Sequence, residues 1–138
     1  MLKFIIHSDG GARGNPGPAA IGVVLSSPEG ETVETISEYI GETTNNQAEY
    51  RAVIAGLEKA KALGAAEVEC VLDSELVVKQ LNGEYKVKHP DLKPVFEQAR
   101  RLALGFSKVQ FRHVRREENK AADKLVNEAL DKESGDAV

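Results

Sequence analysis

Four acidic residues spaced along the chain could together hold divalent cations and hydrolyse a phosphodiester. They are Asp9, Glu49, Asp73 and Asp123. Carboxylate oxygens are hard donors, so a site built from four of them favours Mg²⁺ or Mn²⁺ over Zn²⁺. Two such ions about 4 Å apart can activate a water molecule and stabilise a leaving oxygen. The set therefore indicates metal-dependent cleavage of a nucleic-acid backbone.

Each of these acids, taken alone, also has a simpler explanation. Asp9 and Asp73 follow apolar runs that are typical of strands, and an Asp at a strand end is often a turn or helix cap. Glu49 and Asp123 fall in helical patterns, where acidic side chains are usually just solvated. The metal-site interpretation therefore depends on a fold that brings all four together.

Other metal and phosphate sites find little support in the sequence. Cys70 is the only cysteine, and His7, His89 and His113 are scattered, so no zinc spacing exists. The glycine-rich segment 10–18 lacks the spacing of a P-loop. Its glycines could let backbone N–H groups approach a phosphate or hydroxyl closely. The same segment could also be only a connection between strands.

The elements that must position the four acids follow from the hydrophobic pattern and from glycine and proline breaks. We expect strands at 2–8, 21–26, 32–40, 67–72 and 108–114, and helices at 46–63, 74–81, 91–104 and 119–130. Three strands in a meander, followed by strand–helix alternation, predict an α/β fold with a mixed sheet and helices on its faces. We expect one domain over 1–131 and a short polar tail over 132–138.

The predicted strands also suggest where Asp9 and Asp73 meet. If the first and fourth strands are parallel neighbours, both residues lie at the carboxyl ends of adjacent strands. That edge is where open α/β sheets place their sites. Glu49, one turn into the first predicted helix, and Asp123, on the last, could complete the group.

Four segments of the chain resemble the motifs of type 1 ribonuclease H. They are DGGARGNPGP at 9–18, TTNNQAEY at 43–50, DS at 73–74 and NKAAD at 119–123. They occur in the order and spacing of that family, over nearly the whole chain. The resemblance implies a five-stranded mixed sheet with strand order 3-2-1-4-5, in which the first three strands are antiparallel and helices flank the sheet.

The resemblance also implies an activity and a cofactor. The expected enzyme is an endonuclease that cuts the RNA strand of RNA–DNA hybrids and leaves 5′-phosphate and 3′-hydroxyl ends. Asp9 would bridge two Mg²⁺ ions, and Mn²⁺ would also support activity in place of Mg²⁺. Glu49 and Asp73 would hold the ion near the leaving group, and Asp123 would hold the ion that carries the attacking water.

Several polar residues match substrate contacts of the same family. Asn15, Asn45 and Asn46 match residues that touch the hybrid in its minor groove. Gly11 matches a position near the RNA 2′-hydroxyl, the group that distinguishes RNA from DNA. Thr44 matches a residue that binds a phosphate of the DNA strand. Helix capping is an alternative role for the asparagines and the threonine.

The chain departs from the family pattern in two places. No histidine occupies the loop before the last aspartate, because His113 falls in a predicted strand; Arg115 or Arg116 could act there, or simply form a solvated turn. The stretch 82–89 replaces a basic, aromatic protrusion and lacks tryptophan, although Lys86 and Lys88 leave it some positive charge. The chain looks like the compact archaeal and bacterial members, some of which are less strict, so cleavage of double-stranded RNA is a further expectation.

Charge and composition set limits on partners. The net charge of −4 and the pI of about 5.4 argue against nucleic acid as a partner, unless a local basic patch or bound metal supplies positive charge. We see no signal peptide and no run of about 20 apolar residues that would span a membrane. A single cysteine suits a reducing compartment. We therefore expect a cytoplasmic monomer without membrane contact.

Two rival hypotheses remain from the sequence. The chain could be a nucleic-acid-binding module without catalysis, since fold alone does not prove activity. It could also be a DNA-directed nuclease or an integrase-like relative, because that superfamily shares a similar acidic site. The presence of all four acids opposes the first rival, and the asparagines at 15, 45 and 46 oppose the second.

Overall fold

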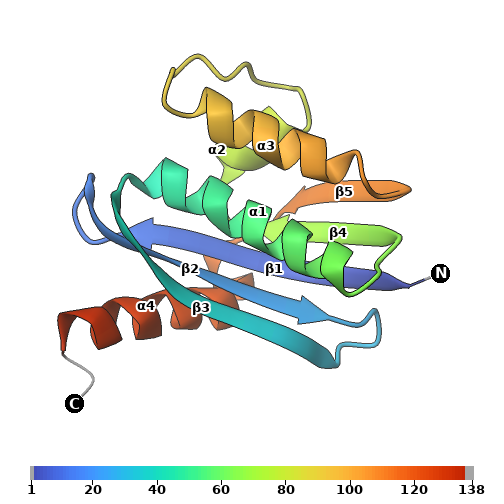
Figure 1. Cartoon of the computed structure of the whole chain (residues 1–138), viewed down its shortest axis with the longest axis horizontal. Coiled ribbons are helices and arrows are strands. Elements are labelled where there is room, and N and C mark those ends of the chain that lie inside the picture. Colours follow the sequence, from blue (N-terminus) through green and yellow to red (C-terminus); the bar gives the residue numbers. More distant parts are fainter. Residues whose placement is uncertain (1, 136–138) are drawn as a thin grey trace.

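A five-stranded sheet forms the centre of the molecule, and helices cover both of its faces (Figure 1). The structure is a computed structural model that describes residues 2–135. The strands lie in the order β3-β2-β1-β4-β5 and are β1 Lys3–Ala12, β2 Gly17–Ser26, β3 Thr32–Thr43, β4 Glu67–Leu72 and β5 Lys108–His113. The β1–β2 and β2–β3 pairs are antiparallel, whereas β1–β4 and β4–β5 are parallel. The predicted α/β mixed sheet is therefore confirmed, including its strand order.

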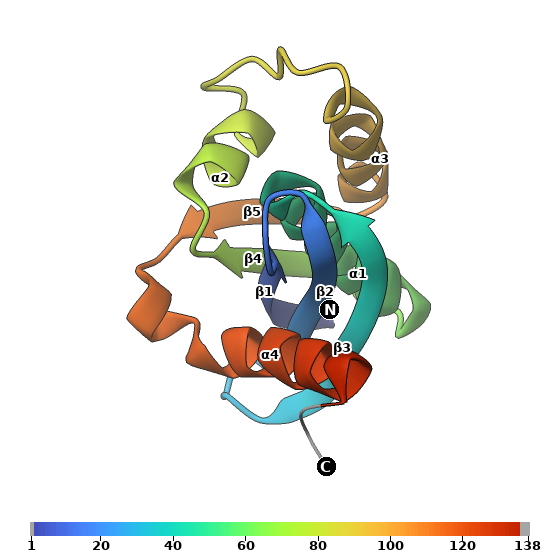
Figure 2. The same cartoon turned by 90° about the vertical axis from the view of Figure 1, so that its left-hand side faces the viewer.

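The helices divide unequally between the two faces of the sheet. They are α1 Asn45–Ala62, α2 Glu75–Leu81, α3 Lys93–Ala103 and α4 Lys120–Ser134, and a short 3₁₀ turn at Arg116–Glu118 precedes α4. Figure 2 shows α1, α2 and α3 on one side and α4 alone on the other. Within residues 2–135, no helix is both long and apolar enough to cross a membrane.

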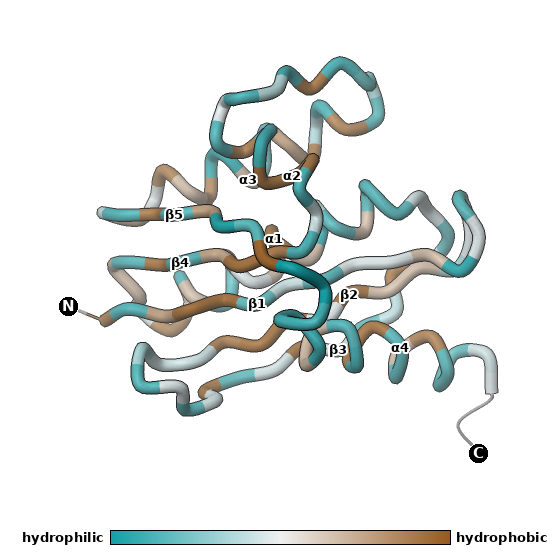
Figure 3. The backbone as a smooth tube through the Cα atoms, turned by 180° about the vertical axis from the view of Figure 1, so that it is seen from behind, coloured by the Kyte–Doolittle hydropathy of each residue, from teal (hydrophilic) through white to brown (hydrophobic). Residues whose placement is uncertain are grey.

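Two hydrophobic clusters hold these layers together. The larger one lies between the sheet and α1–α3, where alternate residues of β1 such as Phe4 and Ile6 meet α1 residues such as Leu57. The smaller one lies under α4 and consists of Ala20, Val126, Ala129 and Leu130. Apolar residues accordingly follow the strands and recur along α4, whereas the connection from β5 to α4 is hydrophilic (Figure 3).

Two expectations about segment boundaries were wrong. The glycine-rich segment 10–18 is a loop only at 13–16, because β1 continues to Ala12 and β2 begins at Gly17, with Gly10 paired to Ile21 and Ala12 to Ala19. Gly10 belongs to β1 and makes room for a helix, as described below. At the other end, α4 continues to Ser134 and ends at Gly135, whose φ of 81° suits glycine. The predicted tail thus starts too early, and 136–138 lie outside the described residues.

Candidate active site

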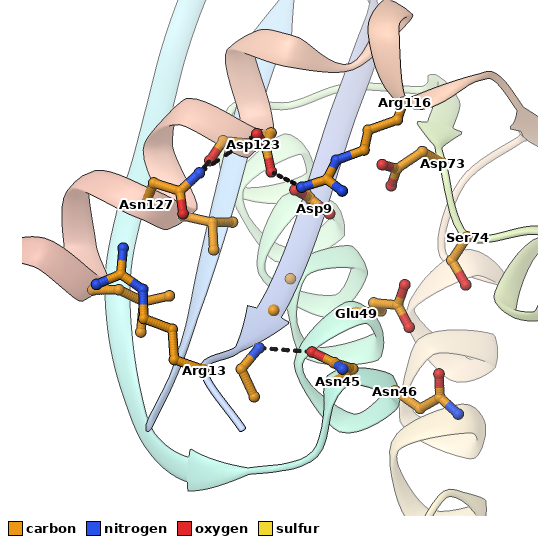
Figure 4. A pocket seen from close by; sticks show the side chains of 15 residues that line it. Asp9, Arg13, Asn45, Asn46, Glu49, Asp73, Ser74, Arg116, Asp123 and Asn127 are labelled. Carbon is orange, nitrogen blue, oxygen red and sulfur yellow. Dashed lines mark hydrogen bonds and ion pairs between the residues drawn. The ribbon is translucent and has the colours of Figure 1, made fainter. Parts of the chain in front are cut away.

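The four predicted acids line one pocket of about 490 Å³ (Figure 4). Asp9 belongs to β1, Glu49 to α1 and Asp123 to α4, and Asp73 lies in the turn after β4. All four side chains point toward the same hollow. Four separate elements must therefore be held in register for the carboxylates to meet.

Parallel pairing of β1 with β4 brings the two strand-end acids together. His7 lies opposite Val71 in this pairing. The same register carried two residues further sets Asp9 beside Asp73, as the sequence predicted. Asp73 directly follows β4, whereas Asp9 lies within β1, which continues to Ala12 because its pairing with β2 extends beyond its pairing with β4. Both residues lie just beyond the carboxyl end of the parallel pairing, where ligands bind in open α/β sheets.

Glu49 reaches the pocket because the first turn of α1 rests directly on β1. Thr44 begins the helix, and its Oγ1 accepts a hydrogen bond from the Gln47 backbone N–H at 3.3 Å. A Cβ atom on Gly10 would lie 2.2 Å from the Ala48 carbonyl oxygen and 2.6 Å from the Glu49 nitrogen. Only glycine permits such an approach. The sequence had suggested that this glycine lets the backbone approach a ligand. In the structure, it lets the backbone of α1 approach β1.

Asp123 is positioned by a second glycine of the same kind. Gly22 of β2 is the cross-strand partner of Asp9. A Cβ on Gly22 would lie 2.2 Å from the Ala122 carbonyl oxygen, so the α4 backbone packs directly against the strand. Sequence reasoning missed this contact, although an isolated glycine within an apolar strand is a known sign of close backbone approach.

The crowding of carboxylates changes how they hold protons. Burial raises the pKa of Asp9 to about 8, and the neighbouring Asp73, Asp123 and Glu49 carboxylates add to this rise. Burial also raises the pKa of Glu49 to about 7, and Asp73 contributes, whereas a hydrogen bond from the Ser74 hydroxyl opposes the rise. Both carboxyl groups therefore resist ionisation unless positive charge is brought close.

The donor chemistry of the pocket fits a hard divalent cation. Four carboxylates supply only oxygen ligands, and a cation among them would allow Asp9 and Glu49 to ionise. Across residues 2–135, however, no three acidic, histidine or cysteine side chains surround one point closely enough to hold an ion as they stand. Arg116 Nη2 also lies 3.5 Å from Asp123 Oδ1. The ligand set therefore stays a prediction.

The predicted substrate residues gather beside the acids. Asn45 and Asn46 line the acidic pocket and also an adjoining hollow of about 660 Å³, which Asn15 and Thr44 line as well. The backbone N–H of Ala12 donates to Asn45 Oδ1 at 2.8 Å, and the backbone N–H of Asn45 donates to Asn15 Oδ1 at 3.1 Å. These amide oxygens serve the fold, so the amide nitrogens are the groups suited to contact acceptors on a ligand.

The remaining predicted residues divide between the pocket and the outside. Gly11 lines the pocket, where an added Cβ would be in ordinary contact with Val126 at 3.7 Å. Of the two arginines proposed as loop assistants, Arg116 lines the pocket and Arg115 does not. Lys86 and Lys88 are exposed on the connection from α2 to α3 and line neither hollow, although His89 of the same connection lines the second one.

Three further polar side chains line the pocket, and the sequence had assigned them no role: Arg13, Ser74 and Asn127. Ser74 begins α2 and contacts Glu49. Asn127 lies one helical turn beyond Asp123, with its Nδ2 3.2 Å from the Asp123 carbonyl oxygen, so an i, i+4 spacing could have identified it. Arg13 reaches Asp131 of α4 at 2.5 Å, and no pattern in the sequence indicates that pairing.

Known proteins share this sequence pattern over most of the chain. Residues 7–129 match the family model described as Reverse transcriptase-like. The chain is 50% identical over 125 residues to Ribonuclease HI of Halobacterium salinarum, a match that covers 91% of this chain and 63% of that protein. It is 48% identical over 131 residues to a bifunctional protein of Mycobacterium tuberculosis, of which it covers 36%. The chain thus spans only part of the length of these curated relatives.

Solved structures share the fold closely. RNase H1 from the archaeon Halobacterium salinarum matches with a TM-score of 0.92 at 47% identity, covering 94% of this chain and 98% of that one. LC11-RNase H1 in complex with an RNA/DNA hybrid matches with a TM-score of 0.89 at 50% identity, covering 94% of this chain and 97% of that one. The similarity therefore includes the whole sheet and the elements that carry the four acids.

Proposed function

This chain belongs to the ribonuclease H family, and from that premise we propose that it is an endonuclease that hydrolyses the RNA strand of RNA–DNA hybrids. The observation that carries the proposal is the convergence of Asp9, Glu49, Asp73 and Asp123 on one pocket. A related enzyme has been solved with an RNA/DNA hybrid, which supports the same substrate here. The expected products end in 5′-phosphate and 3′-hydroxyl groups.

We propose that Asp9 contacts two Mg²⁺ ions, that Glu49 and Asp73 hold one of them, and that Asp123 holds the other. When bound, these ions supply the charge that activates water and stabilises the leaving oxygen; Mn²⁺ would serve as well. The protein holds the carboxylates in place. The Ser74 hydroxyl orients the Glu49 carboxylate through a hydrogen bond, and Arg116 forms an ion pair with Asp123.

The hollow beside the acids offers a path for the duplex. It runs from Asn45 and Asn46, shared by both hollows, to Asn15 and Thr44. Amide donors suit the acceptors in the minor groove, where an RNA strand also displays its 2′-hydroxyls. We propose that Gly11, which lines the pocket, lies near the 2′-hydroxyl beside the scissile bond.

Double-stranded RNA is a second candidate substrate. The α2–α3 connection lines the second hollow with His89, Pro90 and Asp91, whereas Lys86 and Lys88 lie outside both hollows. These two lysines therefore add no contact there that would require a DNA strand. Recognition would then rest mainly on minor-groove and 2′-hydroxyl contacts, which an RNA duplex also provides. We expect slower cleavage of this substrate than of the hybrid.

Cleavage of three end-labelled duplexes tests the proposal: an RNA–DNA hybrid, an RNA duplex and a DNA duplex of one sequence, each with Mg²⁺ or with chelator. We expect Mg²⁺-dependent cuts in the RNA strand of the hybrid and none in DNA. The Asp9→Asn variant, which keeps the side-chain shape, should lose this cleavage while remaining folded. Binding of hybrid without cleavage would instead indicate a non-catalytic module, and cleavage of the DNA duplex would indicate a DNA-directed nuclease.

We further propose that the protein acts as a cytoplasmic monomer. Its single cysteine, Cys70, is buried in the core, and the four carboxylates of the pocket all belong to one chain. Light scattering across a range of protein concentrations would test the monomer, and a mass near 14.9 kDa is expected.

A further inference from the structure

Asn119 is a buried polar residue that joins the last helix to the first strand. Its side chain is almost completely enclosed, with 1% of the residue exposed. Its Nδ2 donates a hydrogen bond of 2.9 Å to the backbone carbonyl oxygen of Ser8, 111 residues away in the sequence. A hydrogen bond buried in this way is stronger than one in water, so the two segments are held at a defined separation.

The two ends of this contact each adjoin a pocket carboxylate. Ser8 directly precedes Asp9 on β1. Asn119 directly precedes α4, and its carbonyl oxygen accepts a hydrogen bond from the Asp123 backbone N–H at 3.1 Å. The side chain and the backbone of Asn119 therefore form a short bridge between the segments that carry Asp9 and Asp123.

Helix capping does not explain this asparagine. Asparagine is a favoured residue at the start of a helix because its side-chain oxygen can accept a hydrogen bond from a backbone N–H of the first turn. In this structure Asn119 has the position of the cap, but its side chain makes no capping hydrogen bond with α4. The amide turns toward β1 instead.

Burial of this amide also has a cost that packing alone would not require. Within residues 2–135, Asn119 Oδ1 and the neighbouring Ser8 Oγ are both buried without a hydrogen-bond partner. Unpaired buried polar atoms are unfavourable, and an apolar side chain of similar shape could fill such a place at little cost. The amide nitrogen, and the contact it makes, is the part of the residue that an apolar side chain could not replace.

We propose that Asn119 is a positioning residue that sets Asp123 at the separation from Asp9 that a shared pair of cations requires. The inference rests on the proposed function. Asn119 touches neither the substrate nor the ions. It acts through α4, whose first turn it ties to the strand that carries Asp9. Residues that orient metal ligands in this indirect way typically contribute about 10- to 100-fold to metal affinity or activity.

Two variants test the positioning contact. Asn119→Leu keeps a buried side chain of similar size but has no donor for the Ser8 carbonyl. Asn119→Ala removes the side-chain amide altogether. Ser8→Ala is a matched control, because it deletes the unpartnered hydroxyl and leaves the carbonyl in place. Ala129→Gly is a second control, because it destabilises α4 at a buried site that does not line the pocket.

The readouts are Mg²⁺ binding by calorimetry without substrate, and kcat and KM for the hybrid, all at temperatures where each variant is folded. We expect both Asn119 variants to bind Mg²⁺ about 10- to 100-fold more weakly and to lose kcat at limiting Mg²⁺. KM for the hybrid should stay within about twofold, since substrate contacts are untouched. Ser8→Ala and Ala129→Gly should bind Mg²⁺ as the wild-type protein does.

Two results would overturn the inference. One is wild-type Mg²⁺ affinity in folded Asn119→Leu, which would show that the hydrogen bond to the Ser8 carbonyl is not needed to place Asp123. The other is an equal loss of Mg²⁺ affinity in Ala129→Gly, which would mean that any loosening of α4 has the same effect. Failure of the proposed function is separate, because it would appear as wild-type protein that binds Mg²⁺ in the calorimeter but leaves the hybrid intact.

Discussion

Asp9 is the residue whose chemistry depends most on its neighbours. Its ordinary pKa of 3.8 rises to about 8 because the carboxyl is buried among three others. The folded protein therefore holds a proton on Asp9 over a pH range in which the unfolded chain does not. The contribution of Asp9 to the stability of the metal-free protein is therefore fully present below the unfolded pKa and is lost as pH rises from about 4 to about 8.

Replacement of Asp9 by asparagine should stabilise the metal-free protein at alkaline pH. Asn has no charge to bury, so the free energy of unfolding at pH 8 should rise by about 2–4 kcal/mol, and the difference from wild type should shrink toward pH 4. Urea unfolding in chelator at several pH values measures this. Added Mg²⁺ should stabilise the wild type and have little effect on the variant. A variant less stable than wild type at pH 8 would contradict the account.

The pH dependence of cleavage should itself depend on metal concentration. Metal ligands must lose their protons, and the pKa of Asp9 is raised to about 8 and that of Glu49 to about 7. At low Mg²⁺ we expect activity to rise between about pH 6 and pH 9, and higher Mg²⁺ should move the midpoint to lower pH. Initial rates measured at several pH values and Mg²⁺ concentrations test this. A pH midpoint of activity that does not change with Mg²⁺ concentration would argue against Asp9 and Glu49 as metal ligands.

At the scale of elements, two close backbone contacts assemble the pocket. Gly10 of β1 receives the first turn of α1, and Gly22 of β2 receives α4. Gly22 is also paired with Asp9, so α4 lies against the strand directly beside the central acid. The carboxylates on α1 and α4 thus depend on two glycines on opposite faces of the sheet.

The Gly22→Ala variant should push α4 away from the sheet. The new methyl would fall 2.2 Å from the Ala122 carbonyl oxygen, and overpacking of this kind costs about 1–3 kcal/mol. Because Asp123 follows Ala122, cleavage should fall more than the folded fraction does. Thermal melts with cleavage rates below the transition would show it. Ala20→Gly, which removes a methyl under the same helix, is the control and should cost stability while largely preserving the rate per folded molecule.

At the scale of the whole molecule, charge is the unusual property. The chain carries a net charge of −4 and must approach a polyanion. The two arginines that line the pocket form ion pairs with acidic residues, Arg13 with Asp131 and Arg116 with Asp123, so their positive charge is partly neutralised. Bound cations would therefore provide much of the positive field that meets the scissile phosphate.

Mg²⁺ and hybrid should consequently strengthen each other's binding. We expect KM for the hybrid to fall as Mg²⁺ increases and, by thermodynamic reciprocity, the Mg²⁺ concentration for half-maximal rate to fall as hybrid increases. Initial rates over a matrix of both concentrations measure the coupling, with constant ionic strength maintained by KCl as the control for screening. Independent saturation by the two would contradict the charge argument.

The sequence by itself determined the parts of this protein and their order. Hydrophobic periodicity located every strand and helix, and β4 was predicted over its full length at 67–72. The apolar runs before Asp9 and Asp73 predicted that these two acids lie side by side, although β1 continues past Asp9 to Ala12. The motifs that resemble ribonuclease H supplied the strand order. These features are local or depend on residue type, so they can be predicted from the sequence.

Only the tertiary structure decided how the parts meet. It showed that Gly10 and Gly22 receive helices, that the amide of Asn119 reaches Ser8, and that Arg116, not Arg115, faces Asp123. The glycine and asparagine contacts join segments that are far apart in the chain. The arginine contact distinguishes two side chains that are adjacent in the sequence. The physical reason is that such contacts depend on the packing distance and rotation of whole elements, which no periodicity in the sequence records.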